Sequence, residues 1–274
     1  MSTKTDCLLG KETRYDLDYD SKILHAIPRK ENREELNITT PLPFQGVDIW
    51  NAYEVSWLDF KGKPKIAICQ FGIPCESSHI IESKSLKIYL NSLNQMKCPI
   101  DDHIKNIIQR DLSNTLGIPI NIHLFQPNHF SEFTFEEFEG KCIDDLDIEI
   151  DQYTIEPNFL RSIPNTYVEE TLYSNLLKSN CLITLQPDWG SILIRYKGPK
   201  IDQEGLLRYI ASLRCHQEFH ENCIERIYMD IMRQCKTEML TVYGKYTRRG
   251  GVDICPFRSN FEPNPIDFAR SARQ

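Results

Sequence analysis

The chain has no long apolar run, no Cys-x-x-Cys pair and no Gly-x-Gly-x-x-Gly segment. Without about 20 consecutive apolar residues, no segment is expected to span a bilayer as a helix. Because its ten cysteines are scattered, they do not indicate a structural zinc site. Without the glycine fingerprint, a Rossmann crevice for a dinucleotide is not expected either.

Basic residues are in the minority. Lys and Arg number 32 against 39 Asp and Glu, which gives a net charge of -7. A nucleic-acid footprint needs a basic face, so we expect no direct nucleic-acid partner. The first residues, Met1 to Cys7, contain no apolar signal core. We therefore expect a cytoplasmic protein without a membrane segment, whose cysteines stay reduced.

The composition is that of a globular protein, with 41% hydrophobic residues among 274. Residues 1–46 contain scattered tyrosines and prolines, and we expect an extended arm with little regular structure. Two β-friendly segments, 47–60 and 65–73, flank a Lys-Gly-Lys-Pro turn and predict a hairpin. Further on, the apolar spacing predicts a helix that starts near Ser83 to Ser85, and a second from Asp101 to Leu116 that ends at Gly117. A strand is predicted over 118–124.

Residues 131–151 are acidic, with nine carboxylates against Lys141 alone. Part of the segment alternates like a strand, so it predicts a hairpin strand followed by a linker with a solvated acidic face. A metal site is the less favoured alternative.

The second half repeats the order of the first. Strands are predicted over 166–174, 191–196 and 238–246, and helices over 206–213 and from about 221 to 235. Hairpin, two helices and further strand thus occur twice, which predicts two similar α+β halves, although no clear sequence repeat is visible. We expect an arm (1–46), a first module (47–150) and a second module (151–274).

One stretch of the second half carries candidate chemistry, from Ser179 to Gly190. Cys181 precedes a short apolar run and Asp188 follows it, so a fold-back brings a thiol and a carboxylate together. Such a pair suits nucleophilic attack by a thiolate and proton delivery by an acid. The alternative is a buried cysteine that acts as a small hydrophobe and an aspartate that belongs to a turn.

A second candidate is the segment from Cys215 to Glu221, between the two helices of the second half. The carboxylate of Glu221, beside His220, can accept hydrogen bonds from a guanine-like edge with adjacent N–H donors. Alternatively it is a helix-start acid with a solvated histidine. A metal site of Cys215, His216 and His220 is a further alternative, but a fourth ligand is missing.

Two basic segments remain. The helix start near Ser83 carries Lys84 and Lys87, and free backbone N–H groups beside lysines form a natural phosphate site. The alternative is an ordinary amphipathic helix with a serine cap. The segment from Thr247 to Gly251, Thr-Arg-Arg-Gly-Gly, can grip a phosphate at a strand end, or is only a charged turn.

Together, these four segments resemble one family, the longer two-module NADPH-dependent 7-cyano-7-deazaguanine reductases. These are nitrile reductases of queuosine biosynthesis with the tunnelling fold. The segment Glu82-Ser-Lys-Ser-Leu-Lys87, followed by Ile88-Tyr89, matches the family's cofactor signature. Leu86 stands where an aromatic residue is often found. The signature lies in the first half, and the segments around Cys181 and Glu221 lie in the second, as the two-module form requires.

The resemblance implies two tandem tunnelling-fold modules, each an antiparallel sheet with two helices packed on one face. It also implies a chemistry. The Cys181 thiolate attacks the nitrile carbon and forms a thioimide, and Asp188 protonates the nitrile nitrogen. Reduction of a nitrile to an amine is a four-electron change, so two NADPH are consumed.

The resemblance further implies which residues bind. The deazaguanine ring is held by His220 and Glu221, with help from Ile81, Glu82, Ser83 and Phe219. NADPH is held by Ser83, Lys84, Lys87, Arg248, Arg249 and Gly250. No metal is expected. Because this fold closes its barrel by association, a homodimer or a larger homo-oligomer is expected.

Two other functions stay open at this point. The chain could be a zinc-dependent cyclohydrolase or pterin-type enzyme of the same fold, with Cys215 and His220 as ligands. It could instead be a purine-binding module without catalysis, in which ligand affinity is indifferent to loss of Cys181.

Overall fold

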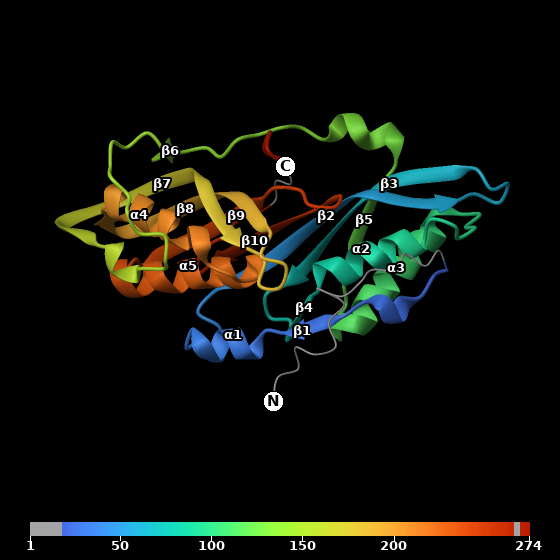
Figure 1. The fold of residues 1–274 in the computed structure, drawn as a ribbon, viewed down its shortest axis with the longest axis horizontal. Coiled ribbons are helices and arrows are strands. Elements are labelled where there is room, and N and C mark those ends of the chain that lie inside the picture. Colours follow the sequence, from blue (N-terminus) through green and yellow to red (C-terminus); the bar gives the residue numbers. More distant parts are fainter. Residues whose placement is uncertain (1–17, 266–268) are drawn as a thin grey trace. The chain divides into compact units, whose positions relative to one another are not determined.

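The computed structural model describes residues 18–265 and 269–274 (Figure 1). They form two compact units. The first comprises the described residues up to Glu31, with Ile49–Phe133 and Arg248–Asp253. The second comprises Asn32–Asp48, Thr134–Thr247 and Ile254–Gln274. Each unit contains antiparallel strands and two long helices, which confirms the predicted α+β class. The module boundaries at 46 and 150 stay a prediction.

The first unit contains three neighbouring strands in the order β5-β3-β2. They are β2 (Gln45–Leu58, within this unit from Ile49), β3 (Pro64–Pro74) and β5 (Ile122–Phe125). Its long helices are α2 (Ser83–Ser92) and α3 (Asp101–Leu116). A separate two-stranded sheet joins β1 (Ala26–Pro28) to β4 (His79–Ile81), which ends directly before α2.

The helices of the first unit form where the apolar spacing predicted them. Ile104, Ile108 and Leu112 are completely buried on α3, at the spacing of one helix face. Gly117 ends this helix with a φ of 70°, a left-handed conformation that glycine adopts without strain. The hairpin of β2 and β3 is likewise confirmed.

The second unit contains strands in the order β10-β9-β8-β7-β6. They are β6 (Lys141–Cys142), β7 (Ser162–Asn180), β8 (Pro187–Ile201), β9 (Met239–Tyr246) and β10 (Val252–Ser259, within this unit from Ile254). Its long helices are α4 (Gln203–Ser212) and α5 (His220–Cys235), which lie against one face of these strands (Figure 1). The turn end of the long β7–β8 hairpin lies beside the segment that leads into α5, because Asn180 is hydrogen-bonded to His216 and Glu218.

The two units share a short sequence repeat that the sequence-based expectation did not include. The segment from Ile81 to Leu93 matches the segment from Ile201 to Leu213 at five positions: Ile81/Ile201, Leu86/Leu206, Tyr89/Tyr209, Ser92/Ser212 and Leu93/Leu213. The contacts repeat as well. The tyrosine hydroxyl of the first helix donates to an aspartate of the second helix, from Tyr89 to Asp111 (2.8 Å) and from Tyr209 to Asp230 (2.7 Å).

Three segments differ from the sequence-based expectation. The predicted arm contains α1 (Lys30–Glu35), a helix of six polar residues with no buried side chain. It could not be predicted from apolar spacing, because it has no apolar stripe. The part of the arm before residue 18 lies outside the described residues. The acidic segment forms only β6, which pairs parallel with β7, and no hairpin strand. Strand β10 was not predicted at all.

Among the described residues, no helix is both long and apolar enough to cross a membrane.

Candidate active site

The tip of the β7–β8 hairpin presents the candidate thiol and carboxylate. Ser179 pairs with Asp188 across the two strands, and the Cys181 N–H donates to the Gln186 carbonyl (2.9 Å). Strand β7 ends at Asn180, so Cys181 is the first residue beyond it, and its backbone bond keeps it next to the strand that carries Asp188. Both are buried, at 5% and 6% exposure.

Asp188 lies in a strand and not in a turn, although Pro187 precedes it. The strand continues through Gly190, where a Cβ atom would come within 3.1 Å of the Lys245 carbonyl oxygen on β9. This close approach of two backbones explains why glycine stands at that position. The turn reading of the aspartate is thus wrong.

The carboxylate of Asp188 faces the start of α5. Its Oδ1 lies 3.7 Å from Nε2 of His220, the first residue of that helix. The His220 ring packs edge-on against the Tyr246 ring, with centroids 4.2 Å apart and planes at 88°. A strand residue therefore fixes the plane of the imidazole, and the imidazole lies beside the candidate acid.

Two neutral groups line the same region. Burial raises the pKa of the Tyr246 hydroxyl well above its usual value, and the nearby Cys223 thiol raises it further. Burial likewise raises the pKa of Cys223 to about 12. Neither group is ionised near neutral pH, so Tyr246 and Cys223 add no charge to the surroundings of Asp188. Neither residue stands out in the sequence, because each falls on an ordinary apolar stripe.

Glu221 follows His220 and is 1% exposed. A carboxylate in the first turn of a helix is favoured by the helix dipole, which offsets part of the cost of burial. Phe219 is the N-cap residue of this helix and provides no side-chain cap hydrogen bond. The structure thus places Phe219, His220 and Glu221 consecutively at the helix start, as predicted from the sequence.

The segment that leads into α5 is tied to the end of β7. The Asn180 N–H donates to the His216 carbonyl (2.8 Å), and the Glu218 N–H donates to the Asn180 carbonyl (3.1 Å). Asn180 immediately precedes Cys181, so these two bonds fix the backbone from which the thiol projects. Inspection of the sequence did not reveal this pairing, because the partners lie almost 40 residues apart.

The side chain of Glu218 is buried in the same segment. His216 Nε2 lies 2.9 Å from its Oε2, and Arg226 donates to both of its oxygens (3.0 and 2.9 Å). His216 is therefore a partner of a carboxylate, while Cys215 is exposed. Within residues 18–265 and 269–274, no group of three or more His, Cys, Asp or Glu residues is arranged to hold a metal ion.

This cluster predicts a pH dependence of stability. Burial alone raises the pKa of Glu218, but the bonds from His216 and Arg226 outweigh it and lower the pKa below its usual value of 4.5. A carboxyl group whose pKa is lower in the folded state than in the unfolded state stabilises the fold at pH values above its unfolded-state pKa. This stabilisation is lost as the pH falls through its folded-state pKa. We expect Glu218→Gln to flatten the acid limb of the unfolding free energy between pH 5 and pH 3, measured by urea unfolding. Glu204→Gln, at an exposed site, should leave the limb unchanged.

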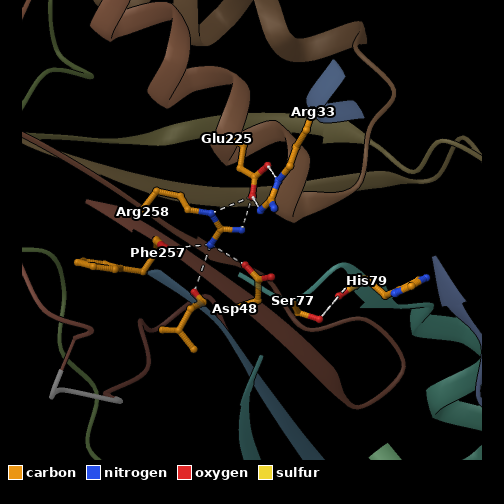
Figure 2. Close-up of polar contacts among 8 residues, drawn as sticks. Arg33, Asp48, Ser77, His79, Glu225, Phe257 and Arg258 are labelled. Carbon is orange, nitrogen blue, oxygen red and sulfur yellow. Dashed lines mark hydrogen bonds and ion pairs between the residues drawn. The ribbon is translucent and has the colours of Figure 1, made fainter. Parts of the chain in front are cut away.

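A buried ionic network anchors α5 one turn beyond Glu221. Figure 2 shows Arg258 of β10 between Glu225 of α5 and Asp48. Its guanidinium lies 2.9 Å from Glu225 Oε1 and 2.8 Å from Asp48 Oδ1, and all three side chains are 0% exposed. Arg33 adds two further bonds to the same glutamate (2.7 and 3.0 Å). This network holds α5 at Glu225 and thereby limits movement of the helix along its axis, which also keeps Glu221 in place one turn earlier.

In the first unit, the start of α2 differs from the predicted serine cap. Glu82 is the N-cap residue, and its carboxylate accepts from the Lys84 N–H (2.8 Å) and the Ser85 N–H (2.7 Å). Two of the backbone donors that were expected to be free for a phosphate are therefore taken. Ile81 and Glu82 are buried at 2% and 1% exposure, whereas Ser83 and Lys84 are partly exposed.

The Arg-Arg-Gly-Gly segment forms a tight turn before β10. Arg249 and Val252 exchange backbone hydrogen bonds (2.9 and 3.4 Å), and φ is 62° at Gly250 and 77° at Gly251. Two consecutive positive φ values are typical of a type I′ turn, which explains both glycines. A Cβ on Gly250 would lie 3.1 Å from Cδ of Lys87, so the turn packs against α2 of the same unit.

The predicted residues therefore fall into two sets. In the second unit the structure brings Asp188 and His220 together directly. Cys181 lies at the turn end of the same hairpin, and Glu221 follows His220. In the first unit it brings Lys87 to Gly250.

Comparison with known proteins identifies relatives over nearly the whole chain. A family model described as nitrile reductase, 7-cyano-7-deazaguanine-reductase N-term, matches residues 15–124, and one described as QueF-like protein matches residues 187–265. A protein of Bordetella pertussis is 50% identical over 266 residues, and one of Burkholderia multivorans is 49% identical over 267 residues. Both alignments cover 97% of each chain, and both relatives are named NADPH-dependent 7-cyano-7-deazaguanine reductase.

Among solved structures, the apo form of an archaeosine synthase QueF-Like aligns with a TM-score of 0.31 and 17% identity. It covers 37% of this chain and all of that one.

Proposed function

The chain belongs to the family of NADPH-dependent 7-cyano-7-deazaguanine reductases, and from that premise we propose that it reduces this nitrile to 7-aminomethyl-7-deazaguanine. As a family member it is an oxidoreductase with NADPH as its cofactor. We place the reaction in queuosine biosynthesis, with a small molecule as substrate and a homodimer or larger homo-oligomer as the working form.

One observation carries the proposal for the catalytic residues. The hairpin that ends at Cys181 also holds Asp188, and that carboxylate lies 3.7 Å from His220 at the helix start that carries Glu221. The proposed nucleophile, the proposed acid and the proposed ring-binding groups are thus carried by two neighbouring segments of one unit.

The chemistry follows from the groups present. A nitrile carbon accepts a hydride poorly, whereas the carbon of a thioimide accepts one more readily. The Cys181 thiolate forms a C–S bond to the nitrile carbon, and Asp188 in its acid form transfers its proton to the nitrogen. NADPH supplies two hydrides when bound, and a second proton completes the amine. The C–S bond breaks after the first reduction, and the thiolate returns to Cys181.

The ring is held by the start of α5. The carboxylate of Glu221 accepts two N–H groups from the guanine-like edge, because an ionised carboxylate offers two acceptor oxygens. His220, whose plane is set by Tyr246, hydrogen-bonds the ring beside it. Phe219 covers the ring and excludes water from the reactive imine. Ile81, Glu82 and Ser83 complete this set in our proposal.

NADPH fits the basic side chains of the first unit. Lys84, Lys87 and Arg249 carry positive charge, and Gly250 lets the backbone approach because a side chain there would collide with Lys87. The backbone amides of Lys84 and Ser85 already donate to the Glu82 carboxylate. We therefore expect the phosphates to be bound by these cations and by Ser83 more than by those amides.

The proposal is tested by incubating the purified chain with the nitrile and NADPH. We expect loss of NADPH absorbance with two NADPH consumed for each amine formed, because four electrons are transferred. A folded, metal-free chain that shows no turnover contradicts the proposal. Stoichiometric zinc in active protein would instead favour a cyclohydrolase-type reaction, and tight purine binding without turnover would favour a binding module.

A second test addresses ring binding. Glu221→Gln keeps the size of the side chain but replaces one acceptor oxygen with an N–H donor that faces the donors of the ring. We expect KM for the nitrile to rise about ten- to hundredfold, which is the range for a lost charge-assisted hydrogen bond. Asp102→Asn is the matched control, because Asp102 is an exposed acid in the first turn of α3. Equal KM values for the two variants would contradict the role of Glu221.

A further inference from the structure

A chain of buried polar side chains runs beneath one aromatic ring in the first unit. Gln70 Nε2 donates to Asn51 Oδ1 (2.8 Å), and Asn51 Nδ2 donates to Asp253 Oδ1 (2.7 Å). The Tyr53 hydroxyl donates to the other oxygen of the same carboxylate (2.6 Å). Exposure is 1% for Asp253 and 7% for Tyr53. The ring of Tyr53 is therefore held at its hydroxyl end by a buried carboxylate that is itself held in place.

A cation lies over the face of the Tyr53 ring. The Arg248 guanidinium lies 4.5 Å from the centroid of the Tyr53 ring, and the residue itself is exposed. A guanidinium over a ring face gains cation–π attraction and keeps its in-plane N–H donors available for an anion. Most surface arginines have no such support, so the position of this one is defined in advance of any ligand.

The backbone around Arg248 is fixed by the same strand. The Tyr53 N–H donates to the Gly251 carbonyl (2.9 Å), which ties the type I′ turn to β2. Nζ of Lys87 would lie 3.6 Å from a Cβ on Gly250, so a second cation lies against the turn. Glu54 lies against Gly251 on another side of the turn, and its carboxylate disfavours an anion there. By charge, an anion at this turn is therefore favoured beside Gly250 and Lys87 and disfavoured beside Gly251 and Glu54.

We propose that Arg248, held in position by Tyr53 and Asp253, recognises the 2′-phosphate that distinguishes NADPH from NADH. This inference rests on the proposed NADPH-dependent function and adds its specificity determinant. A phosphate monoester is a dianion with three acceptor oxygens, and the fork of a guanidinium matches it in a bidentate way. Tyr53 is a positioning residue, because it acts on the nucleotide only through Arg248.

The test measures binding without turnover. Dissociation constants for NADPH and NADH are obtained by fluorescence titration of the full chain in the absence of nitrile. In the unchanged chain NADPH binds more tightly. In Arg248→Ala the affinity for NADPH falls about ten- to hundredfold, as for a lost charge-assisted contact, while the affinity for NADH changes little. The ratio of the two constants is the readout that a merely structural role does not move.

Two tyrosine variants separate the ring from its hydroxyl. Tyr53→Leu removes the support for the guanidinium, and the NADPH/NADH ratio falls severalfold, although less than in Arg248→Ala. Tyr53→Phe keeps the ring and retains most of the ratio. Thermal unfolding of each variant checks that the fold is intact.

Arg214→Ala provides the matched control, since Arg214 is also exposed and its guanidinium also lies over an aromatic ring, that of Trp189 (5.2 Å). Its ratio stays unchanged. An Arg248→Ala variant that still discriminates overturns the inference, as does a wild-type chain that binds both nucleotides equally. A wild-type chain that binds neither nucleotide contradicts the NADPH-dependent function itself, so the two failures are distinguishable.

Discussion

Replacing Cys181 with alanine is expected to lower nitrile turnover by about 10³-fold or more, because the proposed covalent step uses its thiolate as the nucleophile. The change removes one sulfur atom at the end of a strand and leaves the hairpin bonds intact, since these involve the backbone of Cys181. The wild-type chain, mixed with the nitrile in the absence of NADPH, should gain the mass of the nitrile. The alanine variant should show no mass gain.

The other cysteines provide the control. Cys223 lies on α5 close to the same region, but burial raises its pKa to about 12, so it is a thiol and a poor nucleophile at neutral pH. Cys215 is exposed, and Cys215→Ala should retain turnover within about twofold of the wild type. Turnover that survives loss of Cys181 but not of Cys215 would reverse the assignment and revive the reading with Cys215 as a metal ligand.

Replacing Arg258 with methionine is expected to reduce the free energy of unfolding by about 3–5 kcal/mol, the usual cost of breaking a completely buried ion pair. The guanidinium bridges Glu225 and Asp48, and all three side chains are 0% exposed. Methionine fills much of the volume but leaves the Asp48 carboxylate facing an apolar side chain. Glu225 keeps its bonds from Arg33, so the loss is not larger. Urea unfolding followed by circular dichroism measures the change.

A surface pair sets the scale for this experiment. Arg208 and Glu204 lie 3.4 Å apart on α4, with exposures of 31% and 56%. Arg208→Ala should cost less than about 1 kcal/mol, because exposed pairs are screened by water. If Arg258→Met costs no more than this control, the network does not anchor α5. Adding Asp48→Asn to Arg258→Met should recover part of the loss, because the side chain that faces methionine is then neutral, while Glu225 keeps Arg33 as its cation.

The helices and the first hairpin could be predicted because their signals are local. The apolar stripe of α3 and its glycine terminator lie within one stretch of sequence, and burial follows them closely. Strand β10 gave no such signal. All eight of its residues are buried, and they include Pro256 and two charged residues. Asp253 and Arg258 are tolerated there only because their partners come from segments about 200 and 33 residues away.

The candidate site shows the same limit. The residue types at Cys181, Asp188 and Glu221 could be recognised from motifs, because each motif is short. Their neighbours could not. Tyr246 beside His220, and Tyr53 beneath Arg248, are ordinary strand tyrosines whose position depends on strand pairing and on the turn before β10. The Glu82 cap differs for another reason, since serine is the more usual cap and Ser83 and Ser85 both stand close after Glu82.

The repeated Ile, Leu, Tyr, Ser-Leu pattern gives α2 and α4 the same packing framework. The two copies have kept the residues that pack and cap their helices but have diverged at the positions between them. Ser83 and Lys84 in one copy correspond to Gln203 and Glu204 in the other, so a basic helix start has an acidic counterpart. One helix framework thus carries two helix starts of opposite charge, so a basic ligand site is expected at only one of them.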